Sequence, residues 1–151
     1  SQWEVGGLWV DAKRRLVERD PSSPASRRSM RELALAFHRR HDEAAHAAMM
    51  ALLLQHDPAG ADVIATALAL ERDVLPFLQR REWDAALAKL DPLFAKEGEA
   101  GQVVRYQAGQ CELRRGKMGE CIAHFEKAVA LAPETTMAAA INRMLEQLKP
   151  A

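Results

Sequence analysis

The sequence predicts an all-α protein built from stacked antiparallel helix hairpins, and three observations support this prediction. Alanine, leucine and arginine are abundant, whereas aromatic residues make up only 5% of the chain and runs of β-branched residues are nearly absent. Apolar residues recur with the 3.6-residue period of a helix along most of the chain. Short segments that contain Gly, Pro or Asp interrupt this period, as expected for helices joined by turns.

Eight helices are expected in order along the chain. Only one segment between them, "DPSSPAS" from Asp20 to Ser26, has the composition of a linker. The other breaks in the helical period are short, so neighbouring helices should pair as hairpins. The expected helices lie near residues 8–19, 28–39, 42–56, 60–80, 83–95, 101–115, 119–131 and 135–148.

Several helix ends carry recognisable signals. Asp57 is a predicted N-cap, with Pro58 at the first helical position. Thr135 or Thr136 is expected to cap the last helix. Pro76 lies inside a helical stretch and removes a backbone hydrogen bond there, so a kink or a break is predicted just before it.

Composition excludes several classes of protein from first consideration. The 21 basic and 21 acidic residues balance, so no net field would draw the chain to nucleic acid or to an anionic membrane. No apolar run approaches the roughly 18 residues of a spanning helix, so membrane insertion is not expected. Two cysteines are too few for a disulfide framework. Free thiols favour a cytoplasmic location, although the absence of an initial Met leaves the compartment open.

The segment "VVRYQAGQCELRRGKMGECIAHFEKAVALAPE" has the spacing of a helix, a turn and a second helix. An apolar stripe precedes a turn that contains two glycines, and the helical period then resumes until a proline ends it. A small residue in the first helix should let the second helix approach closely. The positions that carry this pattern are Gly109, Gly116, Cys121, Phe125, Ala128 and Pro133.

This segment resembles the tetratricopeptide repeat, a helix-turn-helix unit of about 34 residues whose pattern ends in A-x3-F…P. Cys121 lies where the family usually has the alanine that opens the second helix, and Phe125 lies where it has the aromatic residue. Ala128 and Pro133 match a further small residue and the terminal proline. The resemblance covers one repeat near residues 102–135 and implies a right-handed solenoid of stacked hairpins, with the last helix as its cap.

Two weaker copies lie upstream, the nearer one 35 residues before Cys121 and the farther one another 42 residues back. The residues expected to be equivalent are Ala86, Leu90 and Leu93 in the nearer copy, and Ala44, Ala48 and Ala51 in the farther one. The chain is therefore expected to divide into an N-terminal helix and linker over residues 1–26, which resembles the end of a preceding repeat, and a repeat domain with its capping helix over residues 27–151.

Two groups of titratable residues have a spacing that suggests metal ligands. Cys121 and His124 lie three residues apart on one predicted helix, but zinc sites need four ligands and usually contain closely spaced cysteine pairs. We therefore expect Cys121 to pack as a small apolar residue and His124 to lie off the apolar stripe. His38, His41 and His46 surround an expected turn but form no H-E-x-x-H pattern.

No Gly-rich phosphate loop, nucleophile elbow or supported pair of carboxylates is present in the sequence. We therefore predict no catalytic residue, no metal site and no cofactor. The chain is expected to be a non-enzymatic module.

The resemblance implies that the concave face of the stack, lined by the first helix of each hairpin, binds a peptide or a helix of a partner protein. The groove-facing positions that transfer from the family are Val103, Tyr106, Gln110, Leu113 and Arg114 on the well-matched repeat, and Leu68, Glu71, Leu75, Leu78 and Gln79 on the repeat before it. Some family members hold a C-terminal carboxylate with Lys and Asn at such positions, which are absent here. A segment with apolar anchors, such as an amphipathic helix, suits these residues better.

The leading hypothesis is thus a protein-protein interaction module that acts as a scaffold or assembly factor. A first alternative is a regulatory or assembly domain that associates with itself through apolar surface at an uncapped end of the array. A second alternative is a helical metal-binding domain built on the turn around His38, His41 and His46.

Overall fold

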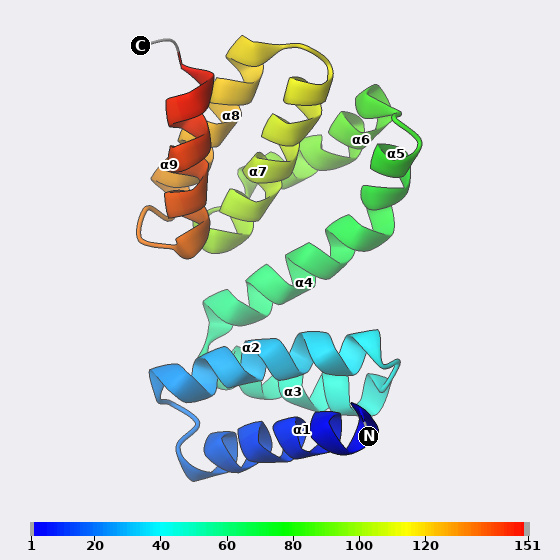
Figure 1. The fold of residues 1–151 in the computed structure, drawn as a ribbon, viewed down its shortest axis with the longest axis vertical. Coiled ribbons are helices and arrows are strands. Elements are labelled where there is room, and N and C mark those ends of the chain that lie inside the picture. The colour runs from blue at the N-terminus through cyan, green and yellow to red at the C-terminus, as the bar shows by residue number, and fades with distance from the viewer. Residues whose placement is uncertain (1, 150–151) are drawn as a thin grey trace. The chain divides into compact units, whose positions relative to one another are not determined.

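The computed structural model of the chain describes residues 2–149, with side chains from Trp9 onward. Every regular element in that range is a helix (Figure 1), which confirms the all-α prediction. Contacts between Cα atoms divide the chain into two compact units, Ser1–Ile64 and Ala65–Ala151. Residues 1, 150 and 151, which the expected domains include, lie outside the described range.

The first unit contains three helices and the start of a fourth. α1 pairs with α2, and α2 pairs with α3. The helices are α1 (Gln2–Arg19), α2 (Pro24–Arg39), α3 (Glu43–His56) and the beginning of α4 (Pro58–Asp73). The large buried side chains of this unit include Met30, Leu33, Phe37 and Leu53.

The start of α2 lies inside the segment that was expected to be a linker. The Ser23 hydroxyl accepts a hydrogen bond from the Ser26 amide at 3.1 Å, and Pro24 occupies the first turn of the helix. Ser26 is buried, and its own hydroxyl donates to the Leu16 carbonyl at 3.1 Å. The polar residues of this segment therefore cap α2 and connect it to α1.

Asp57 caps α4, as the sequence predicts. Its carboxylate accepts the Gly60 amide at 3.2 Å and the Arg31 Nε at 2.8 Å, and Pro58 is the first residue of the helix. Burial alone would raise the pKa of Asp57. The hydrogen bond and charge of Arg31, the Gly60 amide and the charge of Arg27 outweigh burial and lower this pKa below its ordinary value.

The second unit continues from α4 to the C-terminus. Its elements are α4 up to Asp73, α5 (Leu75–Gln79), α6 (Trp83–Leu90), the 3₁₀ helix η1 (Asp91–Ala95), α7 (Gly98–Arg114), α8 (Met118–Leu131) and α9 (Thr136–Leu148). The predicted break before Pro76 is confirmed by the separation of α4 from α5. The helix expected near 83–95 becomes 3₁₀ after Leu90, where Pro92 lacks the amide that an α-helix needs.

Three turns between helices share one hydrogen-bond pattern. His41, Arg81 and Gly116 have left-handed φ angles of 59°, 58° and 77°. In each turn this residue donates its amide to the carbonyl three residues earlier, and the next residue donates to the carbonyl five residues earlier. This is the Schellman motif. The pairs α2–α3, α5–α6 and α7–α8 are therefore hairpins of the same construction, with turns at residues 41, 81 and 116.

The turns also define the register of the second helices. Five residues after the turn residue lie Cys121 in α8 and Ala86 in α6, both with 0% exposure. The equivalent residue of α3 is His46, whose Nδ1 lies 2.7 Å from the Ala34 carbonyl of α2. The register expected for this hairpin is wrong, because its three alanines are exposed: Ala44, Ala48 and Ala51. A slip of two residues turns a helix by about 200° and so reverses its faces.

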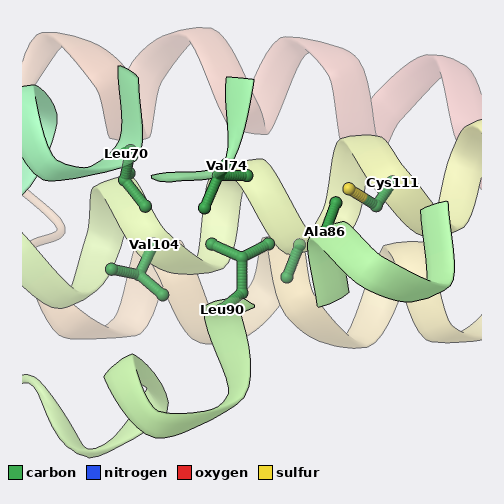
Figure 2. Close-up of a cluster of buried hydrophobic side chains, with 7 residues drawn as sticks. Leu70, Val74, Ala86, Leu90, Val104 and Cys111 are labelled. Atoms are coloured by element: carbon green, nitrogen blue, oxygen red, sulfur yellow. The ribbon is translucent and has the colours of Figure 1, made fainter. Parts of the chain in front are cut away.

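Two hydrophobic clusters fill the second unit. In the first, side chains from α4, the turn after it, α6 and α7 converge (Figure 2), namely Leu70, Val74, Ala86, Leu90, Val104, Ala108 and Cys111. The second cluster lies between α8 and α9 and contains Cys121, Phe125, Ala128, Ile141 and Leu145. Gly109 of α7 meets Phe125 of α8 so closely that a Cβ would lie 2.3 Å from the ring. The predicted close approach of the two helices at Gly109 is thereby confirmed.

Candidate functional site

Two adjoining cavities lie between the α4–α5 segment and α7. The apolar cavity, of about 180 Å³, is lined by Ala67, Leu70, Glu71, Val74, Leu75, Leu78, Val103 and Gln107. The polar cavity, of about 280 Å³, is lined by Leu78, Gln79, Arg81, Trp83, Gln107, Gln110, Cys111 and Arg114. Because Leu78 and Gln107 line both cavities, we describe the two together as the α5–α7 groove.

The two walls of the α5–α7 groove run in the same direction. Val103, near the start of α7, lines the apolar cavity together with α4 residues such as Ala67. Arg114, at the end of α7, lines the polar cavity together with Arg81, which follows α5. Figure 1 shows the end of α4 and α7 running in the same direction. The groove therefore lies between the first helices of two successive hairpins.

Most of the residues expected to bind a partner line this groove. On the α4–α5 side they are Glu71, Leu75, Leu78 and Gln79, and on α7 they are Val103, Gln110 and Arg114. Three other expected residues do not line either cavity: Leu68, Tyr106 and Leu113.

Tyr106 and Leu113 instead pack against the α8–α9 cluster. The Tyr106 ring stacks on Phe125 with a centroid distance of 5.8 Å and an interplanar angle of 14°. Its hydroxyl accepts a hydrogen bond from Gln110 Nε2 at 3.0 Å. Tyr106 thus supports the α7 wall of the groove and holds Gln110 in place, so it lies behind the groove.

Sequence reasoning missed Gln107, Arg81 and Trp83. Gln107 lies four residues after Val103 and three before Gln110, a helical spacing that could have found it. Arg81 and Trp83 belong to a turn and to the start of the next helix, so a search restricted to the faces of the first helices could not include them.

Two arginine side chains line the polar cavity, and among the described residues no acidic side chain does. The exposed side chains of Arg81 and Arg114 make no ion pair with any residue that the structure describes. The carboxylates nearest in the sequence are paired with other cations. Glu82 binds Arg80 at 3.1 Å, and Arg115 binds both Asp84 at 2.9 Å and Glu112 at 2.7 Å.

Cys111 lines the polar cavity as a protonated thiol. Burial, with a smaller contribution from the charge of Glu112, raises the pKa of Cys111 to about 11. A thiol with this pKa is a weak nucleophile and a poor metal ligand at neutral pH. Burial also raises the pKa of Cys121, whose side chain packs in the α8–α9 cluster as expected.

The other histidines have few neighbouring side chains that could join them in binding a metal ion. His38 and His46 have ring centroids 5.4 Å apart, and the Nδ1 of His46 faces a backbone carbonyl. His124 is half-buried, with Arg105 Nη1 at 3.3 Å from its Nδ1 and the Phe94 ring at 5.3 Å. Among the described residues, no three His, Cys, Asp or Glu side chains gather closely enough to hold a metal ion.

Within residues 2–149, none of the helices combines the length and the apolar character that crossing a bilayer requires. No family model matches this chain, and neither does any curated protein or solved structure.

Proposed function

We propose that the chain is a non-enzymatic protein-protein interaction module whose α5–α7 groove binds a segment of a partner protein. The observation that carries this proposal is that Leu78 and Gln107 line both cavities, which places the apolar and polar cavities next to each other. Leu75 lines the groove with 41% of its surface exposed, so its side chain is available as an apolar contact. An apolar anchor of the partner would cover Leu75, and the module would act as a scaffold or assembly factor.

A tetratricopeptide-like architecture for residues 65–149 is part of this proposal. The α5–α6 and α7–α8 hairpins share the same turn, and the small residues Ala86 and Cys121 are buried at equivalent positions of their second helices. In a right-handed solenoid of this kind the first helices line the concave face. The α4–α5 segment and α7 are the first helices here, and α9 would serve as the cap of the stack.

The groove suits a segment with apolar side chains at one end and polar groups at the other. The apolar cavity offers Leu75, Leu78 and Val103 as contacts, and Glu71 is its one charged residue. A bound helix would insert apolar residues spaced three or four apart, whereas an extended strand would insert alternate residues.

A displayed library of random 12-residue peptides tests this proposal directly. We expect wild-type protein to enrich peptides with apolar anchors. A variant with Leu75→Glu and Gln107→Trp, which charges one wall and fills the shared centre of the groove, should bind the recovered peptides at least ten-fold more weakly. Its helical circular dichroism and melting temperature should match those of the wild type.

The matched control is Leu54→Glu, which changes a leucine of α3 that is 65% exposed and lies outside the groove. This control should bind the recovered peptides with wild-type affinity. Failure to enrich any peptide, or equal affinity for the wild type and the groove variant, would contradict the proposal.

The exposed face of α3 favours self-association as a second candidate function. This face is formed by apolar residues with helical spacing: Ala44, Ala47, Ala48, Ala51 and Leu54. Small residues allow two helices to approach closely, so a second copy of the chain could pack on them. Light scattering over a concentration series should then show a dimer that Leu54→Glu converts to a monomer. A monomer at all concentrations would exclude this function.

A further inference from the structure

We propose that the polar cavity recognises the carboxylate of an Asp or Glu side chain, so that the α5–α7 groove selects segments in which an acidic residue lies next to apolar anchors. This inference rests on the proposed function and names the class of partner that the groove accepts. In this arrangement the apolar cavity binds the apolar side chains of the partner segment, and the polar cavity binds its Asp or Glu carboxylate.

The side chains around the polar cavity favour an anion over other polar groups. Arg81 and Arg114 enter from two different elements, the turn after α5 and the end of α7. Guanidinium groups only donate hydrogen bonds, and their planar fork matches a carboxylate. The other polar lining groups are three neutral amides that can complete the hydrogen bonding: Gln79, Gln107 and Gln110. No carboxylate lines this cavity within the described residues.

The charge of this cavity is a local feature. Residues 65–151 contain twelve basic and twelve acidic side chains, so the second unit as a whole exerts no net attraction on an acidic segment. The carboxylates that flank Arg81 and Arg114 in the sequence form ion pairs with other residues. Glu82 pairs with Arg80, and both Asp84 and Glu112 pair with Arg115. An incoming carboxylate would therefore meet two guanidinium groups that form no ion pair with any described residue, at the end of the groove away from Glu71.

The opposite end of the groove has the opposite charge. Glu71 lines the apolar cavity. In the sequence, two groove leucines, Leu75 and Leu78, lie between Glu71 and Arg81. Because like charges repel, this end disfavours an acidic residue. The groove therefore also specifies an orientation, with the acidic end of the segment over the polar cavity.

The backbone conformation of Arg81 allows one of the two cations to be removed without destabilising the fold. Arg81 has a φ of 58°, which disfavours side chains with a Cβ, and Gly116 occupies the equivalent position of the next hairpin at 77°. Arg81→Gly should therefore remove the guanidinium and relieve backbone strain at the same time. A loss of binding in this variant cannot be attributed to a loss of folding if its melting temperature is at or above that of the wild type.

The experiment uses peptides recovered with wild-type protein from the 12-residue library. They are resynthesised with acetylated and amidated ends, so that only side chains supply carboxylates. Each is compared with a version in which Asp and Glu become Asn and Gln. We expect the recovered peptides to contain an acidic residue beside apolar anchors, and the amide version to bind wild-type protein at least ten-fold more weakly.

The variant with Arg81→Gly and Arg114→Gln should bind the acidic and amide versions with equal affinity. The control is Arg143→Gln, which removes an exposed cation of α9 that lines neither cavity and should leave the preference intact. Equal affinity of wild-type protein for both versions would overturn the inference while leaving groove binding intact. A requirement for a free C-terminal carboxylate would overturn the assignment to a side chain. If no peptide is recovered, the proposed function fails and this inference fails with it.

Discussion

Two glycines in neighbouring helices differ in what surrounds them. A Cβ at Gly109 would lie 2.3 Å from the Phe125 ring, whereas a Cβ at Gly119 would have no atom within 4 Å. Phe125 is fully buried, so its ring has no free space to move into. Gly109 is therefore required for the packing of α7 on α8, while Gly119 only increases the flexibility of the unfolded chain.

Gly109→Ala should lower the free energy of unfolding by about 1–3 kcal/mol, because the added methyl group overpacks the contact with Phe125. Gly119→Ala should raise it by about 0.5–1 kcal/mol, because alanine costs less conformational entropy in a helix. Urea denaturation of the two variants beside the wild type measures both effects. Equal effects would mean that α7 and α8 separate to accommodate the methyl group at little cost.

His124 should make stability depend on pH. Burial lowers the pKa of His124, and the positive charge of Arg105 lowers it further, against the weaker opposing effects of Glu112 and Glu120. Protonation is therefore easier in the unfolded chain than in the folded one. The contribution of His124 is fully present above the unfolded pKa of 6.5 and is lost as the pH falls through the lower folded value.

His124→Gln should therefore lose less stability than the wild type between about pH 7.5 and about pH 5. The measurement is the urea midpoint at each pH. His41→Asn serves as the control, since His41 is exposed and asparagine tolerates its left-handed backbone. The prediction is wrong if His124→Gln and the wild type lose stability in parallel.

At the scale of elements, one buried amide links α7 to the end of α8 and to the start of α9. Gln102 of α7 is only 2% exposed. Its Nε2 donates to the carbonyls of Ala128 and Ala132 at 2.9 Å each, and its Oε1 accepts from the Thr135 hydroxyl at 2.7 Å. Thr135 also caps α9 through the Ala138 amide. Gln102 thus satisfies the last carbonyls of α8 and positions the start of α9.

Gln102→Leu should destabilise the protein by about 2–3 kcal/mol, because it removes the three hydrogen bonds that the buried amide makes, at about 1 kcal/mol each. Hydrogen exchange should show the largest loss of protection in α9. The matched control is Gln147→Leu, which makes the same substitution at an exposed position of α9. Unchanged protection of α9 in Gln102→Leu would show that the Ile141 and Leu145 contacts hold the helix by themselves.

The helix ends were largely predictable from sequence because their signals are local. Asp57 and Thr135 act as caps, and Pro76 separates two helices, through groups within a few residues of each. The register of the first hairpin was not predictable in the same way. His46 replaces the expected small residue by bonding to the Ala34 carbonyl, and this contact between two helices has no signature in a family pattern.

At the scale of the whole molecule, the two hydrophobic clusters of the second unit lie entirely after residue 65. The first unit has its own buried residues, among them Met30 and Leu33. Each unit therefore buries apolar side chains contributed by its own helices, which is the requirement for independent stability.

A fragment from Asp57 to Ala151 should fold without the rest of the chain. It retains all of α4 with its capping carboxylate and both clusters of the second unit. Circular dichroism should show helix content and one cooperative thermal transition, and residues 58–64 should exchange their amide hydrogens fastest. A fragment that melts without a cooperative transition would show that the second unit depends on the first.

The sequence by itself determined the helical class, most helix ends and the small-residue contact at Gly109, because helix periodicity, capping and proline chemistry act over a few residues. Tertiary structure decided which side of α7 forms the groove. Gln107 and Tyr106 are adjacent in the chain, yet Gln107 lines both cavities and Tyr106 packs on Phe125. That difference depends on where the α4–α5 segment and α8 lie around α7, and such long-range placement follows from the summed packing of many side chains.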